Sequence, residues 1–278
     1  MKKDILKQLK NNFIIYTENN KKTLNLKNSI KNIKKLYLNK KNFFIIIKKF
    51  EKDPNKIISK TIKFSKLFGK PLSQNKHGQK FVLVKPNTKL LKKKLKNKNI
   101  KLRYHQTNLG GAIHSDGPQL YSPPKYVIMA CLNQAKQGGD SIIVSTNKIY
   151  RYLKKNNKKI LNVLKDRFYF ERRGFRFSNN NIFKKAIFEN SYNNFRFRYL
   201  REYIEAGHNI KKSALSPKII NAMNTLDELL NKEKFQTKYK LNEGDIIILN
   251  NDYLAHGRSG FKLNNKGPQR SLLRIWIR

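Results

Sequence analysis

Three residues, His114, Asp116 and His256, have the side chains and the spacing of a mononuclear iron site. Two imidazoles and one carboxylate can hold Fe(II) on one face and leave the opposite face open for chemistry. In a strand or extended turn, residues two apart project to the same side, so His114 and Asp116 can reach one ion together. The third ligand, His256, must then come from a distant strand. This pattern predicts the metal centre of an iron oxygenase.

A His-x-Asp pair by itself says little, because the chain holds five histidines and 17 acidic residues. The ordinary role of a single histidine is that of a hydrogen-bonded structural residue. His77, His105 and His208 have no partner at ligand spacing. We therefore expect these three histidines to be structural or exposed, and the metal hypothesis depends on the segments that surround His114 and His256.

The pattern of apolar residues predicts an α+β fold, mainly β, with strands dominating the core. Runs rich in Phe, Ile and Val indicate strands at residues 12–17, 42–47, 81–84, 126–132, 141–145, 245–250 and 271–277. Helical spacing indicates helices at residues 24–38, 54–68, 146–164 and 217–233. Residues 87–101 are rich in Lys and Asn and predict an exposed loop or lid. We expect one domain over residues 1–278, with residues 147–240 as a helical insertion between two halves of a β core.

The composition is that of a globular cytoplasmic protein. A chain of 278 residues that is 38% hydrophobic, with 17 Phe and 13 Tyr, can bury a large core. No apolar run approaches the ~20 residues that span a bilayer, and the first ten residues have no apolar stretch typical of a secretory signal. Cys131 is the single cysteine, which excludes an internal disulfide and suits a reducing compartment.

The formal net charge of +45 raises the possibility of nucleic-acid binding. Only 13 of the 62 basic residues are arginine, however, and the lysines are spread along the whole chain. Base and phosphate recognition favours arginine, and no nucleic-acid-binding motif is visible. We therefore expect solvated surface lysines and no nucleic-acid partner. One basic, aromatic stretch can help to bind an anionic ligand or can form strands with outward arginines: Arg172, Arg173, Arg176, Arg196, Arg198 and Arg201.

Several segments, in order along the chain, resemble the taurine dioxygenase and clavaminate synthase-like (TauD/TfdA) family of Fe(II)/2-oxoglutarate dioxygenases. Residues 110–117 (GGAIHSDG) resemble its H-T-D-G segment, and residues 138–141 (GGDS) its G-G-(E/D)-(T/S) turn. Residues 250–261 (NNDYLAHGRSGF) resemble its distal N-x-x-x-x-H-G-R-x-x-F box. The same holds for residues 64–72 (FSKLFGKPL), 124–131 (PKYVIMAC) and 269–276 (QRSLLRIW). The resemblance therefore covers the chain from about residue 60 to its end.

The resemblance implies a double-stranded β-helix, a relative of the jelly roll, with iron at its open mouth. His114, Asp116 and His256 match the iron ligands of the family. Arg270 matches the arginine that pairs with the distal carboxylate of 2-oxoglutarate, and Ser141 matches a hydroxyl that also binds this cosubstrate. Arg274, four residues further on, matches an arginine that in some relatives contacts an anionic group of the substrate or cosubstrate. An exposed strand charge is an equally good interpretation of Arg274.

The implied activity is hydroxylation of an unactivated C–H bond, with O₂ and 2-oxoglutarate as cosubstrates and succinate and CO₂ as products. We expect a small substrate, an amino acid or another organic acid, that is anionic or zwitterionic. Two alternatives use the same fold without this chemistry: a basic nucleic-acid-binding protein and a catalytically silent binding protein. The complete set of His114, Asp116, His256 and Arg270 argues against the silent protein, which would be free to lose them.

Overall fold

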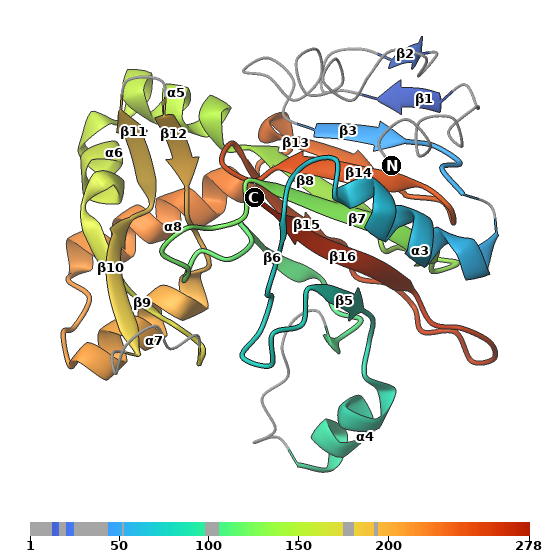
Figure 1. The fold of residues 1–278 in the computed structure, drawn as a ribbon. Coiled ribbons are helices and arrows are strands. Elements are labelled where there is room, and N and C mark those ends of the chain that lie inside the picture. The colour runs from blue at the N-terminus through green and yellow to red at the C-terminus, as the bar shows by residue number, and fades with distance from the viewer. Residues whose placement is uncertain are drawn as a thin grey trace.

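The structure is a computed structural model, and it describes residues 13–16, 21–24, 44–51, 53–97, 106–174, 181–191 and 194–278. Two larger antiparallel sheets, two separate two-stranded hairpins and a set of helices make up most of these residues (Figure 1). The expected helix at residues 24–38 lies outside the described residues, except that Leu24 ends a strand. All seven expected strands and the expected helix at residues 217–233 are present, with ends shifted by a few residues.

The larger sheet has the order β2-β1-β3-β14-β7-β16-β4, with β5 also paired to β16. Its strands are β1 (Phe13–Tyr16), β2 (Lys21–Leu24), β3 (Phe44–Ile47), β4 (Pro71–Leu72), β5 (Phe81–Val84), β7 (Tyr126–Asn133), β14 (Ile246–Asn250) and β16 (Ser271–Ile277). The smaller sheet has the order β13-β8-β15-β6. Its strands are β6 (Gly111–His114), β8 (Ser141–Ser145), β13 (Gln236–Tyr239) and β15 (Leu254–Arg258).

The alternation of side chains along β16 shows how the two sheets build the core. Leu272 and Trp276 point to one side, where they pack with Ile143 of β8 and Leu254 of β15 between the sheets. The next residues along the strand, such as Leu273, point to the opposite side of the larger sheet and pack in a second cluster. Successive side chains in a strand alternate between faces, so β16 places apolar residues on both sides and is buried along its whole length, with Arg274 as its one charged residue.

Helix α3 (Pro54–Ser65) covers the outer face of the larger sheet. The Asp53 side chain accepts a hydrogen bond from Asn55 N at its N-terminus, and Pro54 occupies the first turn, where its missing N–H costs nothing. Ile57 and Phe64 of this helix are buried in the same cluster as Leu273. These contacts confirm the amphipathic helix expected at residues 54–68.

The chain between β8 and β14 holds strands as well as helices, which differs from the expected helical insertion (Figure 1). Its helices are α5 (Thr146–Asn156), α6 (Lys158–Lys165), α7 (Arg201–Lys211) and α8 (Pro217–Asn231), and its two hairpins are β9 (Arg167–Glu171) with β10 (Ile182–Ala186) and β11 (Phe188–Ser191) with β12 (Asn194–Phe197). β13 lies within residues 147–240 yet pairs with β8 of the smaller sheet. The remainder packs on the outer face of that sheet through Val144 and Ala255.

Two local expectations were wrong. Residues 146–164 form two helices, because Asn157 leaves helical geometry (φ −151°) and its side chain caps α6 by accepting from Ile160 N. Within residues 87–101, Thr88–Lys96 form helix α4 rather than a loop, and the Asn87 side chain caps it by accepting from Leu90 N at 3.0 Å. Within the described part of the chain, no helix has the length and apolar character needed to cross a membrane.

Candidate metal centre and adjoining cavities

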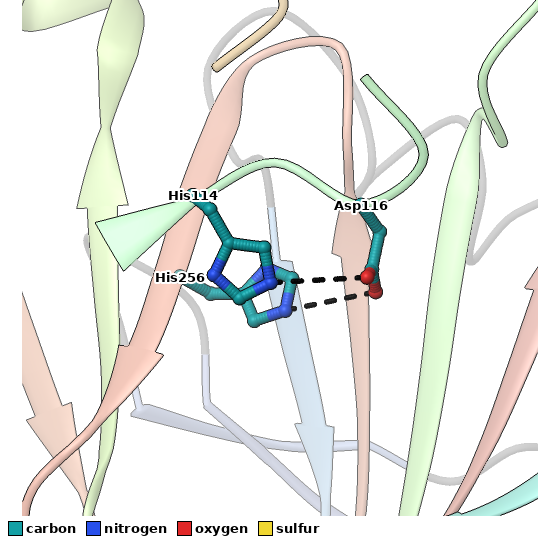
Figure 2. Close-up of side chains that lie close together, drawn as sticks. All are labelled: His114, Asp116 and His256. Carbon is teal, nitrogen blue, oxygen red and sulfur yellow. Dashed lines mark ion pairs between the residues drawn. The ribbon is translucent and has the colours of Figure 1, made fainter. Parts of the chain in front are cut away.

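The structure brings His114, Asp116 and His256 together at the rim of the smaller sheet (Figure 2). His114 ends β6, and its cross-strand partner in β15 is His256. Asp116 follows in the loop after β6. His114 Nε2 lies 3.9 Å from Asp116 Oδ1, and His256 Nε2 lies 3.6 Å from Asp116 Oδ2. One ligand atom from each side chain lies within 4.8 Å of the other two, so the three groups can share one ion.

The protonation states suit a metal. His114 Nδ1 lies 2.8 Å from the carbonyl oxygen of Ala112, which can only accept, so Nδ1 carries the proton and Nε2 keeps its lone pair. Burial lowers the pKa of His114, and it lowers the pKa of His256 to about 3. Burial opposes ionisation of Asp116, but Arg274 and the two histidines outweigh it, and the pKa of Asp116 is lowered. Neutral imidazoles beside an ionised carboxylate are the state in which these ligands bind a divalent ion.

The hydrogen bonds around Asp116 leave one carboxylate oxygen for a ligand. Asp116 Oδ1 accepts from Arg274 Nη1 at 2.8 Å. Asp116 Oδ2 is buried and has no hydrogen-bond partner among the residues that the structure describes. A buried carboxylate oxygen without a partner is costly unless an ion or ligand satisfies it. The donor set of two imidazole nitrogens and this oxygen fits Fe(II), which favours two histidines and one carboxylate on one face.

Asn251 holds the backbone of Asp116 in place. Its side-chain oxygen accepts from Asp116 N at 2.9 Å, and its Nδ2 donates to the carbonyl oxygens of Asp116 and Pro124 at 2.9 and 3.0 Å. Asn251 is itself buried, so water does not compete for its hydrogen bonds. No role is predicted for this residue from the sequence, although it stands five residues before His256 and is the asparagine of the N-x-x-x-x-H-G-R-x-x-F motif.

Arg274 is not an exposed strand charge. It is buried on β16, its Nη1 donates to Asp116, and its Nε donates to Gln74 Oε1 at 2.8 Å. Gln74 in turn donates to the carbonyl oxygens of Arg274 and Lys80. Arg274 therefore orients the carboxylate of Asp116 in this structure. Nothing in the local sequence pointed to Gln74, whose partner lies 200 residues further along the chain.

A small cavity of about 50 Å³ adjoins the three-residue centre on the side of Arg270 and Ser141. Both residues line it, together with His114 and His256. Arg270 is buried, and its Nε donates to Gln134 Oε1 and Gly139 O at 3.0 and 3.2 Å. Its two terminal nitrogens have no hydrogen-bond partner among the described residues, and no described carboxylate lies within 4.0 Å. Burial lowers the pKa of Arg270, but a guanidinium stays charged at neutral pH.

A larger cavity of about 280 Å³ opens on the other side of the centre. His114, Asp116 and Arg274 form its floor. Three segments supply most of the rest of its lining, namely residues 74–77, the loop around Asp116 and the start of α7, and Arg173 and Trp276 complete it. A cavity of this size beside a metal centre suits a small organic molecule.

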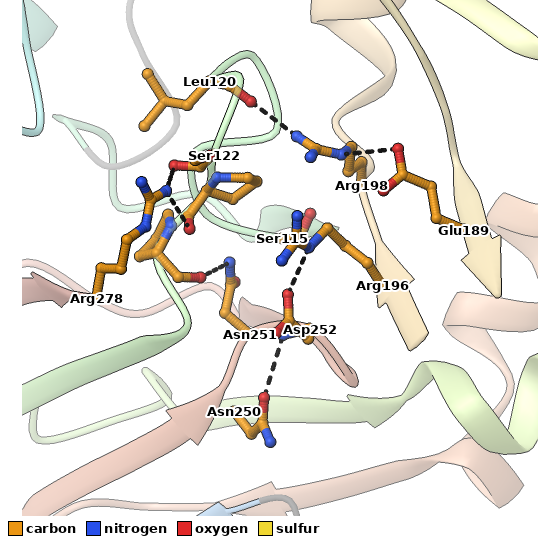
Figure 3. A network of polar contacts seen from close by, with 12 residues as sticks. Ser115, Leu120, Ser122, Glu189, Arg196, Arg198, Asn250, Asn251, Asp252 and Arg278 are labelled. Atoms are coloured by element: carbon orange, nitrogen blue, oxygen red, sulfur yellow. Dashed lines mark hydrogen bonds and ion pairs between the residues drawn. The ribbon is translucent and has the colours of Figure 1, made fainter. Parts of the chain in front are cut away.

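The basic stretch of the insertion serves mainly in structural contacts (Figure 3). Arg198 is buried rather than outward: it donates to the carbonyl oxygens of Leu120 and Tyr121 at 2.7 and 3.1 Å and lies 3.6 Å from Glu189. Arg196 pairs with Asp252 at 2.8 Å. Arg201 pairs with Glu205 and Asp227, and Arg173 with Glu171 and Glu202. Among the described arginines of this stretch, Arg173 alone lines the larger cavity.

Of the other histidines, His208 is a structural residue. It is buried in α7, its Nδ1 contacts Ser213 O at 2.9 Å, and its Nε2 accepts from Tyr169 N at 3.3 Å. His77 is exposed and lines the mouth of the larger cavity. His105 lies outside the described residues.

Among proteins of known function, the chain is similar to a synthase and to a dioxygenase, by the names that these proteins carry. FR-33289 synthase of Streptomyces rubellomurinus (strain ATCC 31215) is 27% identical over 215 residues, which are 75% of this chain and 60% of that protein. Human gamma-butyrobetaine dioxygenase is 25% identical over 155 residues, 54% of this chain and 40% of that protein. The chain thus spans about three-fifths or less of the length of these curated relatives.

Among solved structures, an asparagine oxygenase in complex with Fe(II), 2S,3S-3-hydroxyasparagine and succinate has a TM-score of 0.60 at 14% identity, covering 78% of this chain and 63% of that one. The non-heme iron oxygenase OrfP in complex with Fe and alpha-ketoglutaric acid has a TM-score of 0.55 at 13% identity, with the same coverage. At such identities these likenesses show a shared fold. The family profile described as "Taurine catabolism dioxygenase TauD, TfdA family" matches residues 21–276. The chain therefore belongs to the TauD, TfdA family of dioxygenases.

Proposed function

We propose that this protein is an Fe(II)- and 2-oxoglutarate-dependent dioxygenase that hydroxylates a C–H bond of a small amino acid or other organic acid. The observation that carries the proposal is the buried guanidinium of Arg270 beside the three-residue centre. A buried charge without a counterion is unfavourable, whereas a carboxylate bound by two parallel N–H···O bonds would satisfy it. Among the described residues no carboxylate is within reach, so an anionic ligand is the natural partner.

In this proposal His114, Asp116 and His256 hold the iron, and Arg270 and Ser141 hold 2-oxoglutarate in the smaller cavity. Fe(II) held there would activate O₂, the oxidant, which takes two electrons from 2-oxoglutarate as it is decarboxylated to succinate and CO₂ and two from the substrate C–H bond. The chain's own residues bind and orient the iron, the cosubstrate and the substrate, and they exclude water from the site. Asn251 and Arg274 fix the carboxylate of Asp116, which keeps one of its oxygens directed at the ion. The larger cavity receives the substrate, and Arg274, which lines both cavities, stands between substrate and cosubstrate.

The same proposal extends to the fold and to the compartment. We interpret the two facing sheets as the halves of a double-stranded β-helix with the metal centre at the rim, and the relatives of similar fold support this interpretation. Residues 1–278 then act as one dioxygenase domain. The lone buried thiol of Cys131 suits the reducing cytoplasm.

The relatives also favour a small substrate. One solved relative is a complex with hydroxyasparagine, and another relative is named for gamma-butyrobetaine, so small zwitterions with a cationic nitrogen and a carboxylate are the first to test. No observation on the described residues favours nucleic-acid binding over this function. The intact centre and Arg270 are also unexpected in a catalytically silent protein.

The test is Fe(II)-dependent conversion of 2-oxoglutarate to succinate in the presence of a panel of L-amino acids and small organic acids. Wild type should release succinate with at least one member, and Asp116→Ala should release none. Asp166→Ala removes an exposed carboxylate outside the centre and should behave like wild type. If well-folded, iron-loaded wild type consumes no 2-oxoglutarate with or without the panel, the proposed function is wrong.

A further inference from the structure

Gln74 joins one wall of the larger cavity to the arginine that holds Asp116. Its Nε2 donates to the carbonyl oxygens of Lys80 and Arg274 at 2.9 and 2.8 Å, and its Oε1 accepts from Arg274 Nε at 2.8 Å. Only 6% of Gln74 is exposed. A glutamine carboxamide has two N–H groups, and both are used here, so Gln74 has no donor left for a ligand. Its contacts are with the protein.

The loop that carries Gln74 is held in one shape by its own hydrogen bonds. It connects β4 to β5, and both of these strands pair with β16. Gln74 N donates to Gln79 O at 2.7 Å, and Asn75 Oδ1 accepts from His77 N and Gln79 N at 3.0 and 3.3 Å. Residues 74–77 line the larger cavity. Gln74 therefore contacts Arg274 from a fixed support.

Gln74 holds Arg274 at two points. One contact is at the backbone carbonyl of the arginine and the other is at Nε of its guanidinium, so the carboxamide bridges the two ends of one side chain. An unrestrained arginine side chain has about 2 kcal/mol of rotamer entropy. Arg274 lines both cavities, which gives its guanidinium space to turn. The double contact selects one orientation among these.

The selected orientation decides which oxygen of Asp116 is available to an ion. Arg274 Nη1 donates to Asp116 Oδ1 at 2.8 Å. Asp116 Oδ2 lies 3.6 Å from His256 Nε2 and has no hydrogen-bond partner among the described residues. A carboxylate can bind a metal ion with one oxygen or with both. With Oδ1 engaged by Arg274, one oxygen remains for the ion.

We propose that Gln74 is a positioning residue of the metal centre: it keeps Arg274 on Asp116 Oδ1 and thereby makes Asp116 bind the ion through a single oxygen. This proposal rests on the proposed function. Gln74 acts through Arg274 and not by contact with the ion. A coordination position that a second carboxylate oxygen would fill then stays open for the reactants.

The experiment measures the Kd for Fe(II) by anaerobic titration in competition with a coloured chelator. Gln74→Met keeps the length of the side chain and removes its donors and acceptor, so the Kd should rise about tenfold, as for other losses of a partner that orients a metal ligand. Gln74→Ala leaves room for water and should show the same direction of change if the Met variant does not fold. Gln137→Met, at an exposed glutamine that lines neither cavity, should leave the Kd unchanged.

A double-mutant cycle tests whether Gln74 acts through Arg274. Arg274→Met should itself raise the Kd for Fe(II), and the addition of Gln74→Met to it should change the Kd further by no more than about twofold. Co(II) is the second probe, because its visible bands weaken as its coordination number rises. Gln74→Met should therefore give weaker Co(II) bands than wild type. A purely structural role would lower the melting temperature, add its effect to that of Arg274→Met and leave the Co(II) bands as in wild type.

Three results would overturn the proposal: an unchanged Kd for Fe(II) in both Gln74 variants, unchanged Co(II) bands, or a full tenfold loss in the Arg274→Met background. The two proposals fail in different ways. If wild type binds Fe(II) and the Gln74 variants match it, only the positioning by Gln74 is wrong. If folded wild type binds no Fe(II), the proposed function is wrong and this role falls with it.

Discussion

Two arginines four residues apart, Arg270 directly before β16 and Arg274 within it, line the same small cavity, yet their surroundings are opposite. Arg274 has a carboxylate partner, Asp116, and an amide partner, Gln74. Arg270 is buried to a similar degree, but its hydrogen bonds go only to neutral groups, Gln134 and Gly139. Asp140 attracts it from beyond ion-pair distance. Arg274 therefore positions a protein group, whereas in the proposed function Arg270 pairs with a carboxylate of the ligand.

The comparison also separates stability from binding. Removal of one member of a buried charge pair lowers the free energy of unfolding, because the remaining charge is left buried without its partner. A buried charge without a counterion is a cost that the ligand offsets when it binds. Variants at the two positions should therefore differ in which of these two quantities they change.

The largest expected effect is on cosubstrate binding in Arg270→Leu. The Kd for 2-oxoglutarate should rise about a thousandfold, since loss of one partner of a buried charge pair costs about 2–5 kcal/mol. The free energy of unfolding of the ligand-free protein should be unchanged or higher, because a buried cation without a counterion is removed. Anaerobic ligand titration and urea unfolding measure the two quantities. Binding of 2-oxoglutarate as tight as in wild type would show that Arg270 is not its partner.

Arg274→Met should show the opposite pattern. The variant leaves the carboxylate of Asp116 buried beside one partner fewer, so the free energy of unfolding should fall by about 3 kcal/mol. In wild type the pKa of Asp116 is lowered, so its stabilising contribution is present above the ordinary pKa of 3.8 and is lost as the pH falls through the lowered value. The deficit of the variant should thus be largest at neutral pH and shrink towards acid pH. Urea unfolding between about pH 2 and pH 7 measures the deficit, and a deficit that stays equal below pH 3.8 as well as above it would contradict the pairing.

A smaller effect is expected in Gly139→Ala. Gly139 has φ +77°, and a Cβ there would lie 2.9 Å from Arg270 Cδ and Nε. We expect a loss of about 1–2 kcal/mol of stability from the left-handed backbone and about tenfold weaker 2-oxoglutarate binding from displacement of Arg270. Gly267→Ala is the matched control, since it has φ +87° with open space around the Cβ and should weaken stability alone. Equal 2-oxoglutarate affinity in both variants would mean that contact with Arg270 at Gly139 is unimportant.

The smallest effect concerns Cys131, which interacts electrostatically with Arg270. Burial raises the pKa of its thiol to about 12, although Arg270 lowers it. Because the thiolate is the reactive form, alkylation by iodoacetamide at pH 8 should be negligible in the folded protein and rapid in urea. Mass spectrometry of the modified chain gives the rate. Fast alkylation of the folded protein would show that the region behind Arg270 is open to solvent.

Much of the sheet core was predictable because its signal is local. Runs such as Ile246–Asn250 and Ser271–Ile277 are apolar on both faces, and helix α3 carries its cap and its apolar spacing within a dozen residues. The errors came where a local signal was not used, the capping side chains of Asn87 and Asn157. The Lys-rich segment Thr88–Lys96 has little apolar content, yet it forms a helix with a capping Asn87.

At the site, spacing and resemblance identified His114, Asp116 and His256 as a group, and the structure brings them together. The partners that orient them could not be read from the sequence. The bonds of Asn251 and Gln74 join positions 135 and 200 residues apart, and neither residue type is unusual in its neighbourhood. The same applies to Arg198, whose burial depends on carbonyl oxygens of a loop 78 residues away.

The most direct test of the central claim is an anaerobic titration of the wild-type protein with Fe(II) and 2-oxoglutarate, followed by visible spectroscopy. The account predicts the weak charge-transfer band of the iron–2-oxoglutarate chelate in wild type and its absence in His114→Ala, with both proteins folded. A well-folded wild type that shows no band, or a His114→Ala variant that shows the same band, would contradict the assignment of this centre.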